Sequence, residues 1–170
     1  MSQASALRLL LLSMIWGSSF VFYKIAAADM APAFMAALRV AFGALFLGGL
    51  FALTRKQTQV AKRWKLIAVI AVFASALPFT LVAYASFTVT ASVLVIINAT
   101  APIWAALVAL VWTRAVPSPM ALLGLVLGLL GVAIIVGFDA ATLNTEGTGL
   151  GVAAALAAAA CYGIATNMAK

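Results

Sequence analysis

One uncharged stretch constrains this chain more than any other feature: Leu66 to Thr113 contains no Asp, Glu, Lys or Arg. A helix rises about 1.5 Å per residue, so it needs roughly 20 mostly apolar residues to cross the hydrocarbon core of a membrane. The uncharged stretch is about twice that length and must therefore turn once inside it. The Ser/Thr cluster SFTVTAS, Ser86 to Ser92, is the expected turn.

The chain as a whole has the same character, since 67% of its residues are hydrophobic and 8% are charged. Soluble domains carry about a quarter charged residues, so this composition indicates a membrane protein. Spanning β-barrels alternate apolar and polar residues, whereas these runs are apolar all round. We therefore predict an all-α polytopic membrane bundle of six spans: Leu7–Ala28, Phe34–Leu53, Leu66–Thr88, Ala91–Trp112, Met120–Phe138 and Leu150–Met168.

The loop charges predict the orientation of these spans. Cytoplasmic loops are enriched in Lys and Arg, and a cytoplasmic N-terminus places every basic loop residue inside and every acidic one outside. We expect a multi-pass protein of the plasma membrane, which is the inner membrane in a bacterium. The inner set is Arg8, Arg55, Lys56, Lys62, Arg63, Lys65, Arg114 and Lys170, and the outer set is Asp29, Asp139 and Glu146.

The net charge of +7 does not predict a nucleic-acid partner, because the basic residues fall between hydrophobic runs. The basic loop TRKQTQVAKRWK is interpreted as a retention signal that contacts anionic membrane lipids.

Two distant stretches share a short sequence motif, which we call the repeated phrase. WGSSFVFYKIA begins at Trp16 and YGIATNMAK begins at Tyr162, and a shift of 146 positions superposes both aromatics, both glycines and both lysines, Lys24 and Lys170. The second copy comes five crossings later, and an odd number of crossings reverses the direction of a helix. The phrase therefore indicates an inverted repeat, which many secondary transporters use to expose one central site to either side in turn.

The chain resembles the EamA domain of the drug/metabolite transporter superfamily. The resemblance rests on WGSSFVFYK, APAFMAALRVAFGALFL, YASFTVTASVLVIINATAPIWAALVAL and LLGLVLGLLGVAIIVG, in this order. It implies a ten-helix carrier made of two five-helix repeats. Residues 1–138 would be the first repeat, and residues 139–170 an outside linker with the first helix of an incomplete second repeat. We therefore expect a truncated chain, four helices short, that does not transport alone.

The function implied is a carrier or exporter of small metabolites, such as amino acids or drug-like solutes, by alternating access. The alternative is a non-transporting membrane scaffold or accessory subunit. No enzyme activity, metal or cofactor is expected, because there is no histidine, Cys161 is the single cysteine, and no span holds paired carboxylates. Small multidrug resistance proteins resemble the first helix but carry a glutamate where Met14 stands, which argues against proton exchange for a cationic drug.

Arg39 is the first candidate for a solute site. It lies about 10 Å inward from Pro32 at helical rise, and an ionisable group at such a depth usually faces a cavity or a partner. It would attract an anionic or carboxylate-bearing solute. The alternatives are that it extends to the membrane surface or pairs with Asp29. Lys24, a weaker candidate, lies nearer the outer end and has the same surface alternative.

Proline supplies the second set of candidates. Pro102 removes the hydrogen bond to Asn98, so Asn98, Thr100 and the freed backbone groups would line a polar pocket. Pro78 acts in the same way on Ala74, and the alternative for both prolines is a packing kink.

Aromatic and glycine residues complete the set. Trp16 would stack on a solute or serve only packing, and Tyr84 is a weaker cavity candidate. Gly124 and Gly128 form a GxxxG step that would bring the fifth helix close to a neighbour, with self-association of two copies as the alternative.

Overall fold

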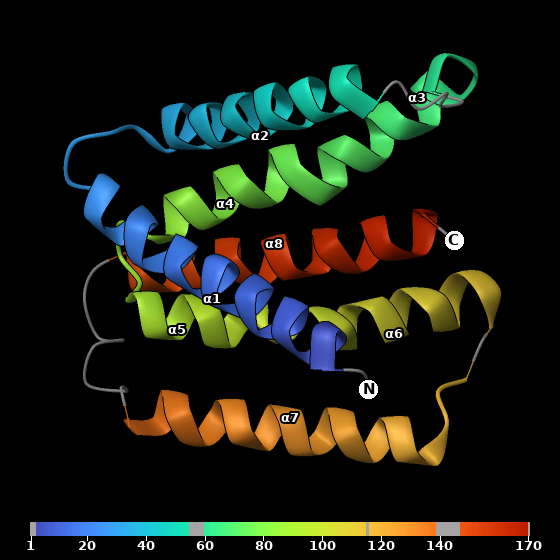
Figure 1. Ribbon diagram of the computed structural model, residues 1–170. Coiled ribbons are helices and arrows are strands. Elements are labelled where there is room, and N and C mark those ends of the chain that lie inside the picture. The colour runs from blue at the N-terminus through green and yellow to red at the C-terminus, as the bar shows by residue number, and fades with distance from the viewer. Residues whose placement is uncertain (1–2, 55–59, 115, 139–146, 170) are drawn as a thin grey trace.

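The computed structural model describes residues 3–54, 60–114, 116–138 and 147–169, and within helices it describes only the backbone of residues 60, 61, 129, 132, 133 and 135–138. The described secondary structure is entirely helical, which confirms the predicted class (Figure 1). The elements are α1 Gln3–Ala26, α2 Pro32–Thr54, α3 Val60–Ala71, the π-helix η1 Val72–Ala76, α4 Leu77–Ala85, α5 Ala91–Asn98, α6 Ala101–Thr113, α7 Pro119–Phe138 and α8 Thr148–Met168.

Five stretches are long and apolar enough to cross a membrane. They are α1, α2, α8 and two composite spans, Lys62–Ala85 and Ala91–Thr113. The part of α7 whose side chains are described without a gap, Pro119–Gly128, is an apolar helical stretch too short to be counted with these five. A helix covers each predicted span to within a few residues, and the expected turn is present because α4 ends at Ala85 and α5 begins at Ala91.

The ends of the bundle separate the described loop charges. The start of α1, the end of α2, the start of α3, the end of α6, the start of α7 and the end of α8 lie at one end, and the α1–α2 and α4–α5 turns lie at the other (Figure 1). Lys62, Arg63, Lys65 and Arg114 therefore lie opposite Asp29. This arrangement agrees with the alternation that the charges predict. Arg55, Lys56, Asp139, Glu146 and Lys170 lie outside the described residues.

Helix α8 lies in the middle of the bundle, where it packs against α4, α5 and α6 (Figure 1). Small residues permit this position. A Cβ added at Gly163 would lie 2.7 Å from the carbonyl carbon of Trp104 and 2.7 Å from the backbone nitrogen of Ala105. The absence of a side chain therefore lets two backbones touch, as in other membrane bundles. The core beside α8 contains Ala85, Val89, Val93, Leu94, Ile97 and Ala155.

Each composite span is interrupted just before a proline, Pro78 in one and Pro102 in the other, where the sequence predicts an interruption. Before Pro78 the chain forms the wide turn η1, in which the N–H of Leu77 donates to the carbonyl of Val72. Before Pro102, α5 ends at Asn98, and α6 begins at Ala101 after a turn. Proline has no N–H to donate and its ring clashes with the preceding helical turn, so each interruption occurs where a regular helix is least favourable.

Lys24 joins α1 to the α4–α5 turn. Its ammonium donates to the carbonyl of Ser86 at 2.9 Å and to that of Val89 at 3.4 Å. Ser86 is itself buried, and its hydroxyl donates to the carbonyl of Ala83 at 2.7 Å. A cation beside the carbonyls at the end of α4 also complements the helix dipole. Lys24 therefore occupies a defined position at the turn.

Candidate functional site

The inner face of α1 forms one wall of a cavity. Trp16, Ser19, Phe20 and Tyr23 are spaced as positions i, i+3, i+4 and i+7, so they share one face of the helix. They enclose a space of about 210 Å³ together with residues from α2, η1, α4, α5 and α8. We call this space the inner cavity, and its other lining residues are Arg39, Ala74, Ser75, Phe79, Val82, Asn98 and Tyr162.

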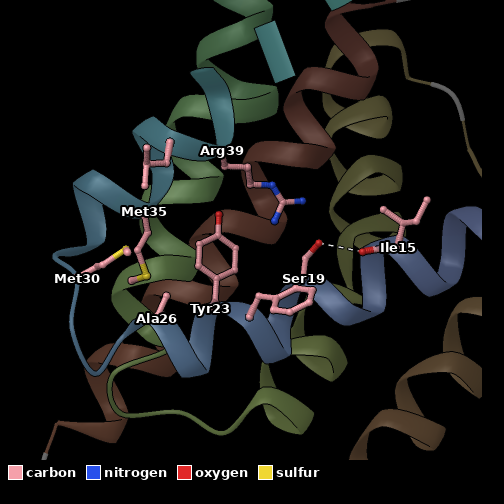
Figure 2. A pocket seen from close by; sticks show the side chains of 9 residues that line it. Ile15, Ser19, Tyr23, Ala26, Met30, Met35 and Arg39 are labelled. Carbon is pink, nitrogen blue, oxygen red and sulfur yellow. Dashed lines mark hydrogen bonds between the residues drawn. The ribbon is translucent and has the colours of Figure 1, made fainter. Parts of the chain in front are cut away.

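Arg39 is the one charged side chain among the described residues that line the inner cavity. Its guanidinium carbon lies 4.4 Å from the centre of the Phe79 ring and 5.5 Å from the centre of the Tyr23 ring. Aromatic faces attract a cation electrostatically, and the attraction is stronger where water is excluded. Within the described chain no ion pair joins Arg39 to Asp29, so the pairing considered from the sequence is not formed. The guanidinium is directed inward, on the side where the hydroxyl of Tyr23 lies (Figure 2).

Tyr23 contributes a second donor. Its side chain is only 6% exposed, and its buried hydroxyl donates to no acceptor among the described residues. An unpaired buried hydroxyl costs roughly 1–3 kcal/mol, so a ligand that accepted its hydrogen bond would recover this energy. Figure 2 shows the hydroxyl and the guanidinium of Arg39 directed into the same space between α1 and α2. The hydroxyl of Ser19 lies nearby and donates to the carbonyl of Ile15 at 3.0 Å.

A wider groove of about 420 Å³ opens between α1 and α2. It shares Ser19, Tyr23 and Arg39 with the inner cavity, so the two spaces meet at these three side chains. We call it the α1–α2 groove. Its remaining lining is apolar and consists of Ile15, Phe22, Ala26, Met30, Met35 and Leu38. The site thus combines a polar end, at the three shared side chains, with an apolar groove.

The structure divides the candidate residues among different places. Trp16, Arg39 and Asn98 line the inner cavity. Thr100 and Pro102 line a separate groove of about 450 Å³ between α6 and α7. The predicted pocket that combines Asn98 with Thr100 is therefore not formed.

Two of the candidates that remain lie apart from both spaces. Lys24 binds the α4–α5 turn and lines neither the inner cavity nor the α1–α2 groove. Tyr84 also lines neither space, and its side chain is exposed.

The GxxxG step of α7 borders the groove that contains Pro102. Nothing that the structure describes lies within 4 Å of a Cβ added at Gly124 or Gly128. The described part of the chain therefore does not make the close helix approach that was expected at these glycines. Self-association through them stays a prediction.

Several cavity residues were not among the sequence candidates. Ser19 and Tyr23 were recognisable, because they follow Trp16 on one helix face. Tyr162 was recognisable too, since it is the counterpart of Trp16 in the repeated phrase, and the two aromatics line the same cavity. Ser75 and Phe79 carried no such signal, because their positions depend on the π-helical turn η1.

A comparison with protein-family models identifies the family of the chain. The model of the EamA-like transporter family matches residues 3–137, which is most of the chain and includes α1, α2, η1, α4 and α5 of the site. Comparisons with curated proteins and with solved structures gave no match. Since the family match extends over more than half of the sequence, the chain belongs to the EamA-like transporter family.

Proposed function

We propose that this chain forms the solute pathway of a carrier that moves small metabolites across the plasma membrane by alternating access. The observation that carries the proposal is the inner cavity, whose described lining includes one cation, Arg39. A charged side chain within a membrane span is costly and usually marks a substrate or ion pathway. Amino acids and drug-like solutes are the candidate cargo, and export is the candidate direction.

The interrupted helices support this proposal. Asn98 ends α5, and Ala74 and Ser75 belong to η1, yet all three line the inner cavity. Transporters often bind solutes where spanning helices are broken, because the freed backbone groups there can contact the cargo. The two interruptions therefore contribute residues to the same cavity as Arg39.

The repeated phrase supports the alternating-access part. Helices α1 and α8 run in opposite directions, since α1 begins and α8 ends at the same end of the bundle (Figure 1). Each contributes the aromatic of the phrase, Trp16 or Tyr162, to the inner cavity. We accordingly interpret residues 1–138 as one repeat and residues 139–170 as the linker and first helix of another. Residues 139–146 and Lys170 lie outside the described part of the chain.

The proposed orientation places the N-terminus in the cytoplasm. The proposed location in a bacterium is the inner membrane. The basic end of the bundle would then face the cytoplasm and contact anionic lipids. A topology reporter fused at Ser2 tests this assignment, and a signal from the external side would reverse it.

The test of function is flux through proteoliposomes, with the four further spans of a two-repeat carrier supplied on the same chain. A panel of radiolabelled amino acids and small carboxylates serves as cargo. We expect saturable flux that Arg39→Ala lowers at least about tenfold per folded molecule, since the change removes the cavity cation. Arg8→Ala is the matched control, because Arg8 is an exposed arginine outside both spaces. An absence of saturable flux for the whole panel would favour the scaffold alternative.

A further inference from the structure

The contacts of Arg39 and Tyr23 allow the cargo to be specified further. We propose that the site takes an amphipathic monoanion, with a carboxylate bound by Arg39 and Tyr23 and an apolar or aromatic body lying in the α1–α2 groove. This proposal rests on the proposed function, because it names the chemical class that the same cavity would carry.

The charge of the lining selects an anion. The described residues that line the inner cavity and the α1–α2 groove include one cation, Arg39, and no Asp or Glu. Phe79 and Tyr23 lie against the guanidinium and contribute no negative charge. An anion is the ligand that would neutralise Arg39 in surroundings where an uncompensated charge is costly.

The donor geometry favours a carboxylate. A guanidinium presents N–H groups in a planar fork that fits two carboxylate oxygens, and this fit is why arginine binds carboxylates with two parallel hydrogen bonds. The hydroxyl of Tyr23 supplies a further donor, is buried, and has no partner in the described structure. Figure 2 shows both groups directed into one space. A bound carboxylate would satisfy the hydroxyl and the guanidinium together.

The volumes require the body of the ligand to extend beyond the inner cavity. Its volume of about 210 Å³ is below the roughly 300–1,000 Å³ of most small-molecule sites. The adjoining α1–α2 groove adds about 420 Å³, and its lining includes Met30, Met35 and Leu38. Methionine side chains adapt to ligands of irregular shape. A carboxylate at Arg39 therefore leaves an apolar body in contact with an apolar groove.

The same lining disfavours a zwitterion. The ammonium group of an amino acid would lie within a few ångströms of its own carboxylate, close to Arg39, and no described lining residue offers it an anionic partner. Neutral acceptors such as Ser19 compensate only part of its lost hydration. A monoanion should therefore bind more tightly than the amino acid of the same body.

Equilibrium binding to residues 1–170 in phosphatidylcholine nanodiscs tests the inference. The probe is radiolabelled 3-phenylpropionate, with 3-phenylpropionamide, phenylalanine and 2-phenylethylamine as competitors of the same aromatic body. We expect unlabelled 3-phenylpropionate to compete at least about tenfold more strongly than any of the three, because none of them carries a net negative charge. Equal competition by the amide or the amine would overturn the proposal, as would no binding above that of empty nanodiscs.

Two variants test the assigned contacts. Arg39→Gln should weaken binding at least about tenfold, and Tyr23→Phe about threefold to tenfold, since each removes donors to a charged group. Tyr23→Phe removes a hydroxyl that has no partner in the described structure, so folding should not suffer. Arg8→Gln is the matched control and should bind like the parent chain. The proposal would be overturned if both single variants, Tyr23→Phe and Arg39→Gln, bound the probe as the parent chain does.

The binding result and the flux result are separable. Flux of another solute class with no preference for the carboxylate would leave the carrier proposal standing and refute the monoanion. Selective carboxylate binding without any saturable flux would refute the carrier proposal and leave the monoanion assignment standing.

Discussion

Helices α1 and α8 carry the same aromatic–glycine phrase, but α8 is much more deeply buried in the protein than α1. In α8, 44% of the most apolar window is buried within the protein, against 6% in α1. Gly163 of α8 is buried against the backbone of Trp104 and Ala105, whereas no described atom lies within 4 Å of a Cβ added at Gly17 of α1. The same residue therefore permits a close helix contact in one copy and makes no such contact in the other.

The aromatic of the phrase behaves differently from the glycine. Trp16 and Tyr162 both line the inner cavity, although Trp16 is 57% exposed and Tyr162 is half-buried. Helix α1 also depends on a contact that the described part of α8 lacks, since Lys24 binds the carbonyls of the α4–α5 turn. Both copies of the phrase thus place their aromatic residue in the cavity, while the contacts that hold each helix in the bundle differ.

The largest expected effect compares the two glycines. Gly163→Ala places a methyl group 2.7 Å from backbone atoms of α6, which cannot rotate away, so α8 must move. We expect a loss of about 1–3 kcal/mol in the free energy of unfolding, measured by unfolding in mixed micelles. Gly17→Ala should change it by less than about 0.5 kcal/mol, since the added methyl meets open space. Equal effects of the two changes would contradict the difference between the helices.

An intermediate effect is expected for the anchor of α1. Lys24→Met removes both hydrogen bonds to the carbonyls of Ser86 and Val89, and it should lower the free energy of unfolding by about 1 kcal/mol. Lys62→Met, at an exposed position of α3, is the control and should be nearly neutral. Binding of 3-phenylpropionate should be the same in both variants, because Lys24 lies outside the cavity. A selective loss of binding in Lys24→Met would instead assign this lysine to the solute pathway.

The smallest expected effect concerns Trp16. Because its side chain is largely exposed, Trp16→Ala should change the free energy of unfolding by less than about 0.5 kcal/mol. It should nevertheless weaken 3-phenylpropionate binding about threefold, since aromatic contacts contribute roughly 0.5–1.5 kcal/mol. Trp112→Ala is the matched control, as Trp112 is similarly exposed and lines neither space. Equal binding by these two variants would remove Trp16 from the site.

The helices and their interruptions were predictable from the sequence because they depend on local chemistry. Apolar run length predicts a spanning helix, and the missing N–H of Pro78 or Pro102 predicts where such a helix breaks. The position of Arg39 along its helix was predictable for the same reason, since α2 begins at Pro32 and helical rise converts sequence separation into distance.

The candidate pocket was predicted only in part. Asn98 and Thr100 are neighbours in sequence, but a turn separates α5 from α6 between them, and the two residues line different spaces. Periodicity describes one helix at a time, so it cannot assign residues on either side of a break to one cavity. The partners of Lys24 were equally hidden, because a turn more than sixty residues away supplies both carbonyls.

The sequence by itself determined the membrane class, the spans, the alternation of charge between the two ends and the repeated phrase. Each of these follows from residue chemistry within a single helix or loop. Only the tertiary structure decided that α8 lies at the centre, that Gly163 rather than Gly17 is packed, and that Arg39 meets Phe79 and the unpaired hydroxyl of Tyr23. The reason is physical: in lipid every spanning helix is apolar all round, so apolarity does not distinguish a central helix from a peripheral one, and close packing decides which faces meet.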